Sequence, residues 1–229
     1  MTTTNTAEIK SQGAVQLTHD LNKLVNLFVD TFPQLSVDDQ HLTLKLYQLL
    51  AEGEPVSYSR LSKALGQSTD VAKETLAQWP GVFYDESDRI VAFLGLSVEK
   101  TQHQLVVNGR TVYSWCAWDT LFIPELLNAT INISSICGAS GEEVKLTASP
   151  SGIESVVPGD AVMSFIIPDE NDLRENITAN FCHFVYFFRS FKDGEAWISR
   201  HDGTFLLSLE EAFKVGQLVN AARYKGALG

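Results

Sequence analysis

The sequence contains few cysteines. Its 229 residues include only Cys116, Cys137 and Cys182. Three cysteines are too few and too scattered for the disulfide framework of a small secreted protein, and none belongs to a CxxC pair of the kind that binds zinc. In a reducing cytosol we expect three free thiols, and a free thiol is by default a small buried hydrophobe. A chemical role for any of them must come from its surroundings.

Basic residues and long apolar runs are also scarce. Lys and Arg total 17 against 28 Asp and Glu, so the net charge is −11 and the clustered positive charge that binds nucleic acid is missing. No run approaches the roughly 18 apolar residues that span a bilayer, and the N-terminus lacks the apolar core of a signal peptide. These absences predict a cytoplasmic globular protein that binds neither nucleic acid nor membrane.

The first part of the chain has the pattern of helices followed by a hairpin. Residues 1–13 are polar and we expect them to be flexible. Apolar spacings, caps and breakers then predict helices at 17–32, 36–53, 57–66 and 69–79, and a hairpin at 82–94. The last three of these helices, followed by the hairpin, have the order of a winged helix-turn-helix. We therefore predict a winged-helix-like domain over residues 14–98.

The helix that would read DNA in such a domain has the wrong side chains. A reader of the major groove needs Arg, Lys, Asn or Gln, whereas TDVAKETLAQW offers Asp70, Lys73, Glu74 and Gln78. The hairpin that would form the wing is acidic. We therefore predict a scaffold without DNA function, since a fold alone does not confer a function.

The second part, residues 99–229, alternates strands and helices. Asn108-Gly109 predicts a hairpin turn, and a helix should begin near Trp115 and be bent or interrupted at Pro124. The very apolar run 181–188 should be a central strand buried on both faces. Further predicted elements are strands at 131–137, 144–149 and 161–168 and helices at 193–201 and 209–224, the last with a capping box at Ser208 and Glu211. The fold class is α+β, in which the winged-helix-like domain precedes a mixed-sheet α/β core.

A thiol lies beside a carboxylate in the segment YSWCAWDT. A cysteine in the first helical turn is favoured as a thiolate by the helix dipole, and Asp119 lies one turn beyond Cys116. A carboxylate so near would repel a thiolate, so the pair makes best sense as proton partners, with Asp119 accepting the thiol's proton and releasing it later. The alternative is a half-buried thiol beside an acid that stabilises a helix start, and spacing alone leaves both open.

The remaining candidates come from other segments. Cys182 in FCHFVYFF is by default core packing. A strand end facing a helix start can nevertheless bring two thiols together, and a soft, two-coordinate metal such as mercury prefers thiolates to nitrogen and oxygen ligands. We expect Cys137, at a turn, to be structural. His183 should point away from Cys182 along a strand. The other histidines have no metal or triad spacing.

Three segments, YSWCAWDTLFIPELL, SSICGASGEEVKLTASPSGI and NFCHFVYFF, resemble in that order the signature of the organomercurial lyases, also called alkylmercury lyases, of bacterial mercury resistance. The resemblance runs from about residue 80 to 222. It implies a catalytic lyase domain at 99–229 that cleaves carbon–mercury bonds by protonolysis. Cys116 and Cys182 would then bind mercury, Asp119 would carry the proton, and Cys137 would be structural.

The residues around the thiols agree with this chemistry, and the resemblance also implies partners. The aromatic side chains Tyr113, Trp115, Trp118 and Phe181 should form a dry substrate pocket. No organic cofactor is expected, because mercury is substrate and product, but excess small-molecule thiol is needed. Cytosolic thiols and mercuric reductase would accept Hg(II). Some members carry a second cysteine where this chain has His183, which leaves auxiliary thiol roles open.

Two other functions remain alternatives at this point. A winged-helix regulator responsive to mercury or another metal would need only the N-terminal fold and the thiols. The acidic helix and wing argue against it. A cysteine hydrolase with Asp119 as base would need a catalytic histidine, which only His183 could supply by facing Cys116.

Overall fold

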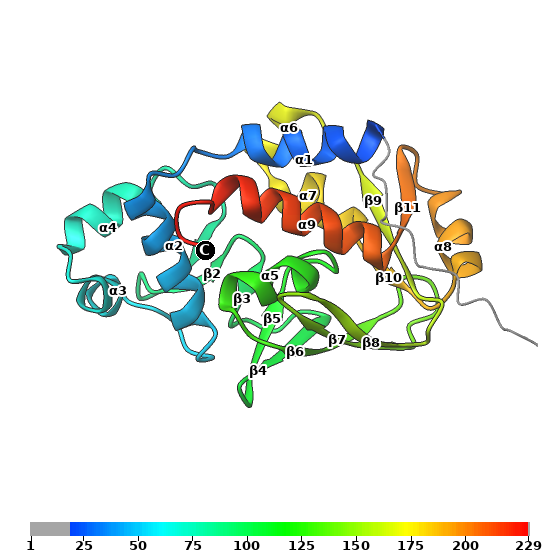
Figure 1. Ribbon diagram of the computed structural model, residues 1–229, viewed down its shortest axis with the longest axis horizontal. Helices are drawn as coiled ribbons and strands as arrows, with labels where there is room; N and C mark the ends of the chain where they lie inside the picture. Colours follow the sequence, from blue (N-terminus) through cyan, green and yellow to red (C-terminus); the bar gives the residue numbers. More distant parts are fainter. Residues whose placement is uncertain (1–18, 229) are drawn as a thin grey trace, which may run out of the picture.

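Two antiparallel sheets and a set of helices make up residues 19–228, which a computed structural model describes (Figure 1). The expectation that residues 1–13 are flexible falls outside this range. No helix in the described part is long and apolar enough to cross a membrane. The helices are α1 (His19–Thr31), α2 (Val37–Leu50), α3 (Tyr58–Leu65), α4 (Thr69–Leu76), α5 (Asp119–Leu127), α6 (Glu170–Glu175), α7 (Ile177–Asn180), the 3-10 turn η1 (Cys182–Phe184), α8 (Phe191–Ile198) and α9 (Leu209–Arg223).

The larger sheet has eight strands in the order β1-β2-β3-β5-β4-β6-β7-β8, and the smaller has the order β10-β9-β11. The strands are β1 (Val82–Tyr84), β2 (Ile90–Phe93), β3 (Leu96–Ser97), β4 (His103–Val107), β5 (Arg110–Ser114), β6 (Ile131–Ile136), β7 (Glu143–Ser149), β8 (Gly152–Val157), β9 (Val162–Ile166), β10 (Phe187–Phe188) and β11 (Thr204–Ser208).

Every strand pair in these sheets is antiparallel. The prediction of α+β is therefore confirmed, but the prediction of a mixed sheet is wrong. Parallel neighbours need long crossover connections, whereas β4–β5, β6–β7 and β7–β8 are joined by short hairpins. The sequence analysis also missed β8.

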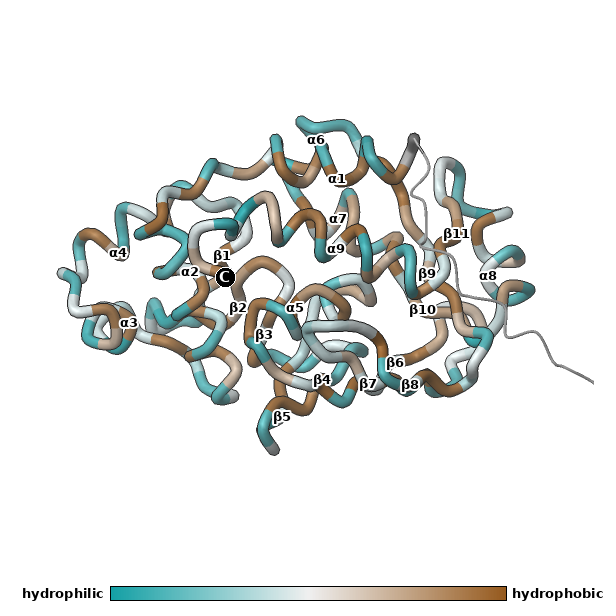
Figure 2. Tube along the Cα trace, in the orientation of Figure 1, coloured by the Kyte–Doolittle hydropathy of each residue, from teal (hydrophilic) through white to brown (hydrophobic). Residues whose placement is uncertain are grey.

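One face of the large sheet is buried and the other is largely exposed. The alternating pattern of period two along β4, β6 and β7 places apolar side chains on the inner face. Register aligns Val112, Leu105, Ile133 and Leu146 in one buried row across four strands. Helix α5 contacts β7, α9 contacts α5 and β8, and α1 contacts α9. In Figure 2, β2 and β3 are hydrophobic where α2 covers them, whereas α6 on the outer surface is hydrophilic.

The capped helices lie where the sequence predicts them. Ser36 with Asp39 and Ser208 with Glu211 form capping boxes at α2 and α9, and Gly66 ends α3 with a left-handed φ of 67°. The Asn108-Gly109 turn joins β4 to β5 with both φ values positive. The order α2, α3, α4, β1, β2 also follows the prediction, and β1–β3 continue into the large sheet, across the boundary predicted at residue 98. The division into domains remains a prediction.

The segment 181–188 is not a strand. Its first part is the turn η1, and only Phe187 and Phe188 pair with β9. The Ser164 hydroxyl donates to the carbonyl of Phe184 and accepts from the N–H of Tyr186, while the Ser164 N–H donates to the carbonyl of Tyr186, so side-chain and backbone bonds together hold this segment against β9. A short apolar run satisfies a buried turn as well as a buried strand.

Helix α5 begins at Asp119, four residues later than predicted. The N–H groups before it have other acceptors: that of Trp115 donates to Gly95 O, that of Cys116 to Asp119 Oδ2 and that of Ala117 to Val185 O. The aspartate side chain thus competes with a helical first turn. Pro124 lies inside α5 without ending it.

Candidate functional site

Cys116, Asp119 and Cys182 converge from two segments far apart in sequence. Their ligand atoms, two Sγ and one carboxylate oxygen, all lie within 4.8 Å of one another, and all three residues are buried. Within residues 19–228 this is the one group of three or more potential metal-ligating side chains so closely spaced. The structure therefore brings together the three residues that the sequence predicts to be catalytic.

The turn before α5 is held on all sides. The N–H of Cys116 donates to Asp119 Oδ2 at 2.7 Å, and the Ser114 hydroxyl donates to the carbonyl of Cys116 at 2.9 Å. Thr120 Oγ1 donates to the carbonyl of Ala117 at 2.7 Å. Since neighbouring backbone groups are all engaged, the thiol and the carboxyl group have little freedom to move apart.

Gly95 lies directly against the carboxyl group. Its φ of +97° is a conformation that favours glycine, and a Cβ added there would come within 2.7 Å of the Cγ of Asp119. The turn it forms, between β2 and β3, is fixed further by Tyr47 on α2, whose hydroxyl donates to the carbonyl of Leu94 at 2.8 Å. Two parts of the N-terminal region thereby position Asp119.

Burial dominates the acid–base properties of the site. It raises the pKa of Asp119 from 3.8 to about 7, although hydrogen bonds from Cys116 and Trp115 act in the opposite direction. Burial likewise raises the pKa of Cys116 well above 9.0, aided by its contact with Cys182 and the charge of Asp119. The pKa of Cys182 is lowered by its hydrogen bond with Cys116 but raised more by burial and by Asp119.

These directions correct one expectation. Cys116 precedes the helix instead of lying in its first turn, so the helix dipole does not make it a thiolate, and at neutral pH both thiols are protonated. The carboxyl group of Asp119 titrates near neutrality. A proton must therefore leave each thiol before it can bind a metal as thiolate, and Asp119 is the adjacent group able to take one.

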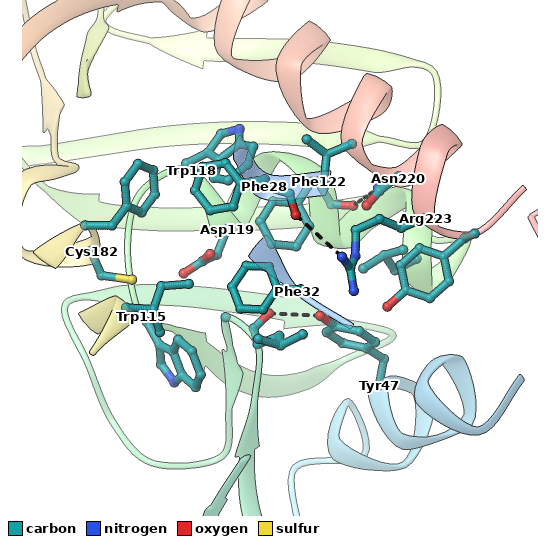
Figure 3. A pocket seen from close by; sticks show the side chains of 17 residues that line it. Phe28, Phe32, Tyr47, Trp115, Trp118, Asp119, Phe122, Cys182, Asn220 and Arg223 are labelled. Atoms are coloured by element: carbon teal, nitrogen blue, oxygen red, sulfur yellow. Dashed lines mark hydrogen bonds between the residues drawn. The ribbon is translucent and has the colours of Figure 1, made fainter. Parts of the chain in front are cut away.

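An aromatic pocket opens onto Asp119 and Cys182 (Figure 3). Trp118 is part of its lining, and its ring centroid lies 4.7 Å from that of Phe28 and 5.8 Å from that of Phe181. The indole Nε1 of Trp118 donates to the carbonyl of Ala212, which ties the pocket to α9. Most of the residues that line the pocket are apolar, which suits a hydrocarbon group.

Three of the four residues predicted to form the pocket do line it, and one does not. Trp115, Trp118 and Phe181 line the pocket. Tyr113 does not, because it lies on β5 between the buried Val112 and Ser114 and so points to the other face of the sheet. Cys116 lies in the cluster but does not contribute to the lining.

The other thiol and the histidine lie elsewhere. Cys137 is buried in the turn after β6, where its N–H donates to Glu142 O at 2.8 Å, and it is outside the cluster. Its structural role remains a prediction. His183 is exposed in η1, directly after the buried Cys182. The hydrolase alternative needs this imidazole beside the buried Cys116, a requirement that an exposed side chain does not meet.

The sequence analysis missed the far wall of the pocket. Phe28 and Phe32 come from α1 and its end, Tyr47 from α2, and Asn220 and Arg223 from α9. These positions carry no local motif and meet only in the folded chain. Gly95 does have a signal, since an isolated glycine in a strand pattern indicates a bulge or a close backbone approach.

The chemistry open to this arrangement is narrow. Two thiols are soft ligands that favour mercury, cuprous or zinc ions over hard cations, and a carboxyl group with a pKa near 7 can both accept and donate a proton. The apolar pocket beside them suits an organic group. Together they favour a reaction in which a soft metal is bound and a proton is transferred.

A family model and individual relatives of this chain carry the same family name. The model of the family described as alkylmercury lyase (MerB) matches residues 96–220. An alkylmercury lyase of Bacillus cereus is 38% identical over 180 residues, 79% of this chain and 80% of the relative. One of Staphylococcus epidermidis is 35% identical over 190 residues, 83% and 86% of the two chains.

A solved structure shares the fold. The crystal structure of the mercury-bound form of MerB2 superimposes with a TM-score of 0.70, covering 90% of this chain and 99% of that one, at 23% identity.

The raised pKa of Asp119 predicts a pH-dependent stability. The unfolded pKa is about 3.9 and the folded value about 7, so the folded state binds the proton more tightly and wild-type stability falls as pH rises through this window. Asp119→Asn removes this loss. We expect its free energy of unfolding, relative to wild type, to increase by about 2 to 4 kcal/mol between pH 5 and pH 8 in urea titrations. A difference that stays constant with pH would contradict the raised pKa.

Gly95→Ala should destabilise the protein by more than a positive φ alone explains. The strained backbone costs about 1 to 2 kcal/mol, and the collision with Asp119 adds to it. Gly109→Ala is the matched control, with a φ of +77° and no atom within 4 Å of the added Cβ. Urea unfolding of both variants should show the larger loss for Gly95→Ala; equal losses would mean that the carboxyl group yields easily.

Proposed function

Because this chain belongs to the alkylmercury lyase family, we propose that Cys116, Cys182 and Asp119 carry out its reaction, the protonolysis of a carbon–mercury bond. The substrates are organomercurials and the products are a hydrocarbon and Hg(II). The observation that carries this assignment is the mutual distance of at most 4.8 Å between the two Sγ atoms and the carboxylate.

Capture begins by exchange of thiols. An organomercurial in a cell is bound to a small thiol, and one of the two cysteines replaces it: the S–H proton leaves with the departing thiol and a sulfur–mercury bond forms. The apolar pocket holds the organic group, supported by the rings of Trp118, Phe28 and Phe181. Water is excluded there, which strengthens later electrostatic interactions.

The second thiol must lose its proton to bind mercury. Asp119 is the acceptor, since its carboxylate contacts Cys116 and its pKa of about 7 allows it to be ionised at neutral pH and yet hold a proton afterwards. Mercury then carries two thiolates and the organic group. Their electron density makes the bound carbon basic.

Cleavage returns that proton to carbon. The electron pair of the carbon–mercury bond takes the proton of Asp119, the hydrocarbon leaves, and the carboxylate is restored. One thiol proton has left with the exchanged small thiol and the other is in the hydrocarbon, so protons balance. Hg(II) remains on Cys116 and Cys182.

Release needs external thiols. Two small thiols can exchange for the two cysteines and return them to the protonated state that burial favours. We therefore propose cytosolic thiols as cosubstrates and mercuric reductase as a partner that accepts Hg(II), with no organic cofactor and a cytoplasmic location.

The N-terminal region is proposed as a winged-helix-like scaffold without DNA function. On α4 the exposed side chains include Asp70, Lys73 and Glu74, and the turn between β1 and β2 exposes Glu86 and Asp88. This mixed and acidic surface does not favour phosphate binding. The region instead supplies Tyr47 and Gly95 to the site, and a regulator is not favoured.

Two cysteines should be indispensable and the third should not. With phenylmercury and excess 2-mercaptoethanol, wild type should release benzene and Hg(II), whereas Cys116→Ser and Cys182→Ser should fall to the uncatalysed rate, since a hydroxyl is a poor mercury ligand. Cys137→Ser is the control: it should lower stability and keep turnover. Substantial benzene release by folded Cys116→Ser or Cys182→Ser would refute the two-thiol mechanism.

Asp119→Asn should separate capture from cleavage. The amide keeps an oxygen to accept from the N–H of Cys116 but cannot deliver a proton at neutral pH. We expect stoichiometric binding of phenylmercury to the cysteines and a loss of single-turnover benzene release of at least about a hundredfold. Binding with near-wild-type release would show that the proton comes from elsewhere.

A further inference from the structure

Arg223 lies on the far side of the pocket from Cys182. It occupies the last turn of α9 and is partly buried, flanked by Asn220 and Tyr47 (Figure 3). The cleavage chemistry described above does not use it. In residues 19–228 no carboxylate lies within ion-pairing distance of its guanidinium.

The hydrogen bonds of Arg223 are few and long. It donates to the carbonyl of Phe28 at 3.5 Å and to that of Pro33 at 3.3 Å. The guanidinium also lies over aromatic rings, 5.4 Å from the centroid of Phe32 and 5.2 Å from that of Trp79. A guanidinium has five N–H donors, so three have no partner in the described chain. Carbonyl oxygens and ring faces thus hold the guanidinium in place, but in the described residues no carboxylate balances its charge.

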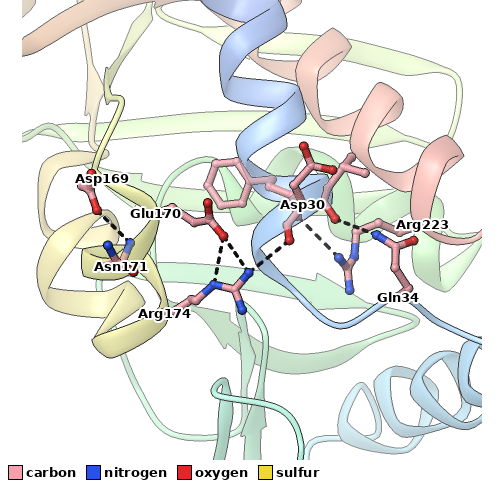
Figure 4. A network of polar contacts seen from close by, with 9 residues as sticks. Asp30, Gln34, Asp169, Glu170, Asn171, Arg174 and Arg223 are labelled. Atoms are coloured by element: carbon pink, nitrogen blue, oxygen red, sulfur yellow. Dashed lines mark hydrogen bonds and ion pairs between the residues drawn. The ribbon is translucent and has the colours of Figure 1, made fainter.

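A purely structural role explains only part of this arrangement. The last carbonyls of α1 need donors, and Figure 4 shows three side chains that serve them: Arg223 on Phe28, Gln34 on Val29 and Arg174 on Asp30. Arg174 does so while paired with Glu170 at 2.7 Å. A cap therefore does not require an unpaired cation, and Arg223 differs from Arg174 in facing the pocket.

Asp119 is not the missing counter-ion. The groups that lower the pKa of Asp119 are Cys116 and Trp115, and Arg223 is not among them. Tyr47, Asp119 and Arg223 all line the same pocket, and no ion pair joins Asp119 to Arg223. Burial lowers the pKa of Arg223, which shows that the cation is poorly solvated and would gain from an anion.

We propose that Arg223 binds a carboxylate carried on the organic group of the mercurial, so that the enzyme favours anionic organomercurials. The inference rests on the function proposed above. Mercury would be held by the cysteines at one end of the pocket, the hydrocarbon part would contact the aromatic side chains, and the carboxylate would accept from the free N–H groups of Arg223. A planar fork of donors suits a carboxylate better than a point charge does.

The test compares one mercurial with an anionic organic group, 4-mercuribenzoate, with two whose organic group is neutral, phenylmercury and the matching amide 4-mercuribenzamide. An uncharged thiol, 2-mercaptoethanol, is used throughout, so the only carboxylate is on the organic group. In wild type we expect kcat/KM for the benzoate to exceed that for the amide by about ten- to a hundredfold. Arg223→Gln should remove most of this ratio, and Arg223→Lys should retain part of it.

The matched control is Arg174→Gln, which also removes a donor to the end of α1 but lies outside the pocket lining. It should change kcat/KM for the benzoate and the amide by the same factor. An equal wild-type preference for the two substrates would overturn the proposal without any variant, as would a ratio that survives in Arg223→Gln or is lost equally in Arg174→Gln. Turnover of phenylmercury by wild type tests the lyase function separately.

Discussion

The hydrogen bond from the Cys116 N–H to Asp119 Oδ2 is the contact on which the site depends. It delays the start of α5, holds the carboxyl group against the thiol and leaves the turn 115–118 free to bond outward. The N–H of Trp115 then donates to the carbonyl of Gly95, and that of Ala117 to the carbonyl of Val185, the residue directly after η1, which contains Cys182. One side chain accepting one backbone donor thereby links the large sheet, α5 and the segment of the second cysteine.

Local features were predictable and tertiary ones were not. The caps of α2, α3 and α9 and the Asn108-Gly109 turn follow from side chains within a few residues of each other, and each lies as predicted. The nearness of Cys116 to Asp119 is local too. The predicted start of α5 was wrong because the side chain of Asp119 accepts a backbone N–H that a helical first turn would use. The predicted strand at 181–188 was wrong because an apolar run does not distinguish a buried turn from a buried strand.

The position of Cys182 beside Cys116 could not be predicted from a local sequence pattern. Its approach to Cys116 depends on how β9, η1 and α5 pack, and the sequence supplied it only through resemblance to a family. Neither a pattern nor the resemblance predicted the far wall of the pocket. Tyr47 and Arg223 belong to no motif, and they line the pocket because of the way α2 and α9 pack. The local pattern predicted a thiolate at Cys116. Burial instead raises the pKa of this thiol, and burial depends on the tertiary structure, which a local pattern does not contain.

The Leu94-Gly95 turn and Tyr47 have a consequence for how mutations can change the site. The family model matches residues 96–220, which contain both thiols and the acid, whereas Phe28, Tyr47, Gly95 and Arg223 lie outside that stretch and line the same pocket. In the proposed mechanism, the groups that break the bond therefore come from one part of the chain, and the pocket wall that meets the organic group comes partly from another. Because the Leu94-Gly95 turn also lies against the carboxyl group of Asp119, a mutation in that part of the wall would alter the position of the acid together with the shape of the pocket.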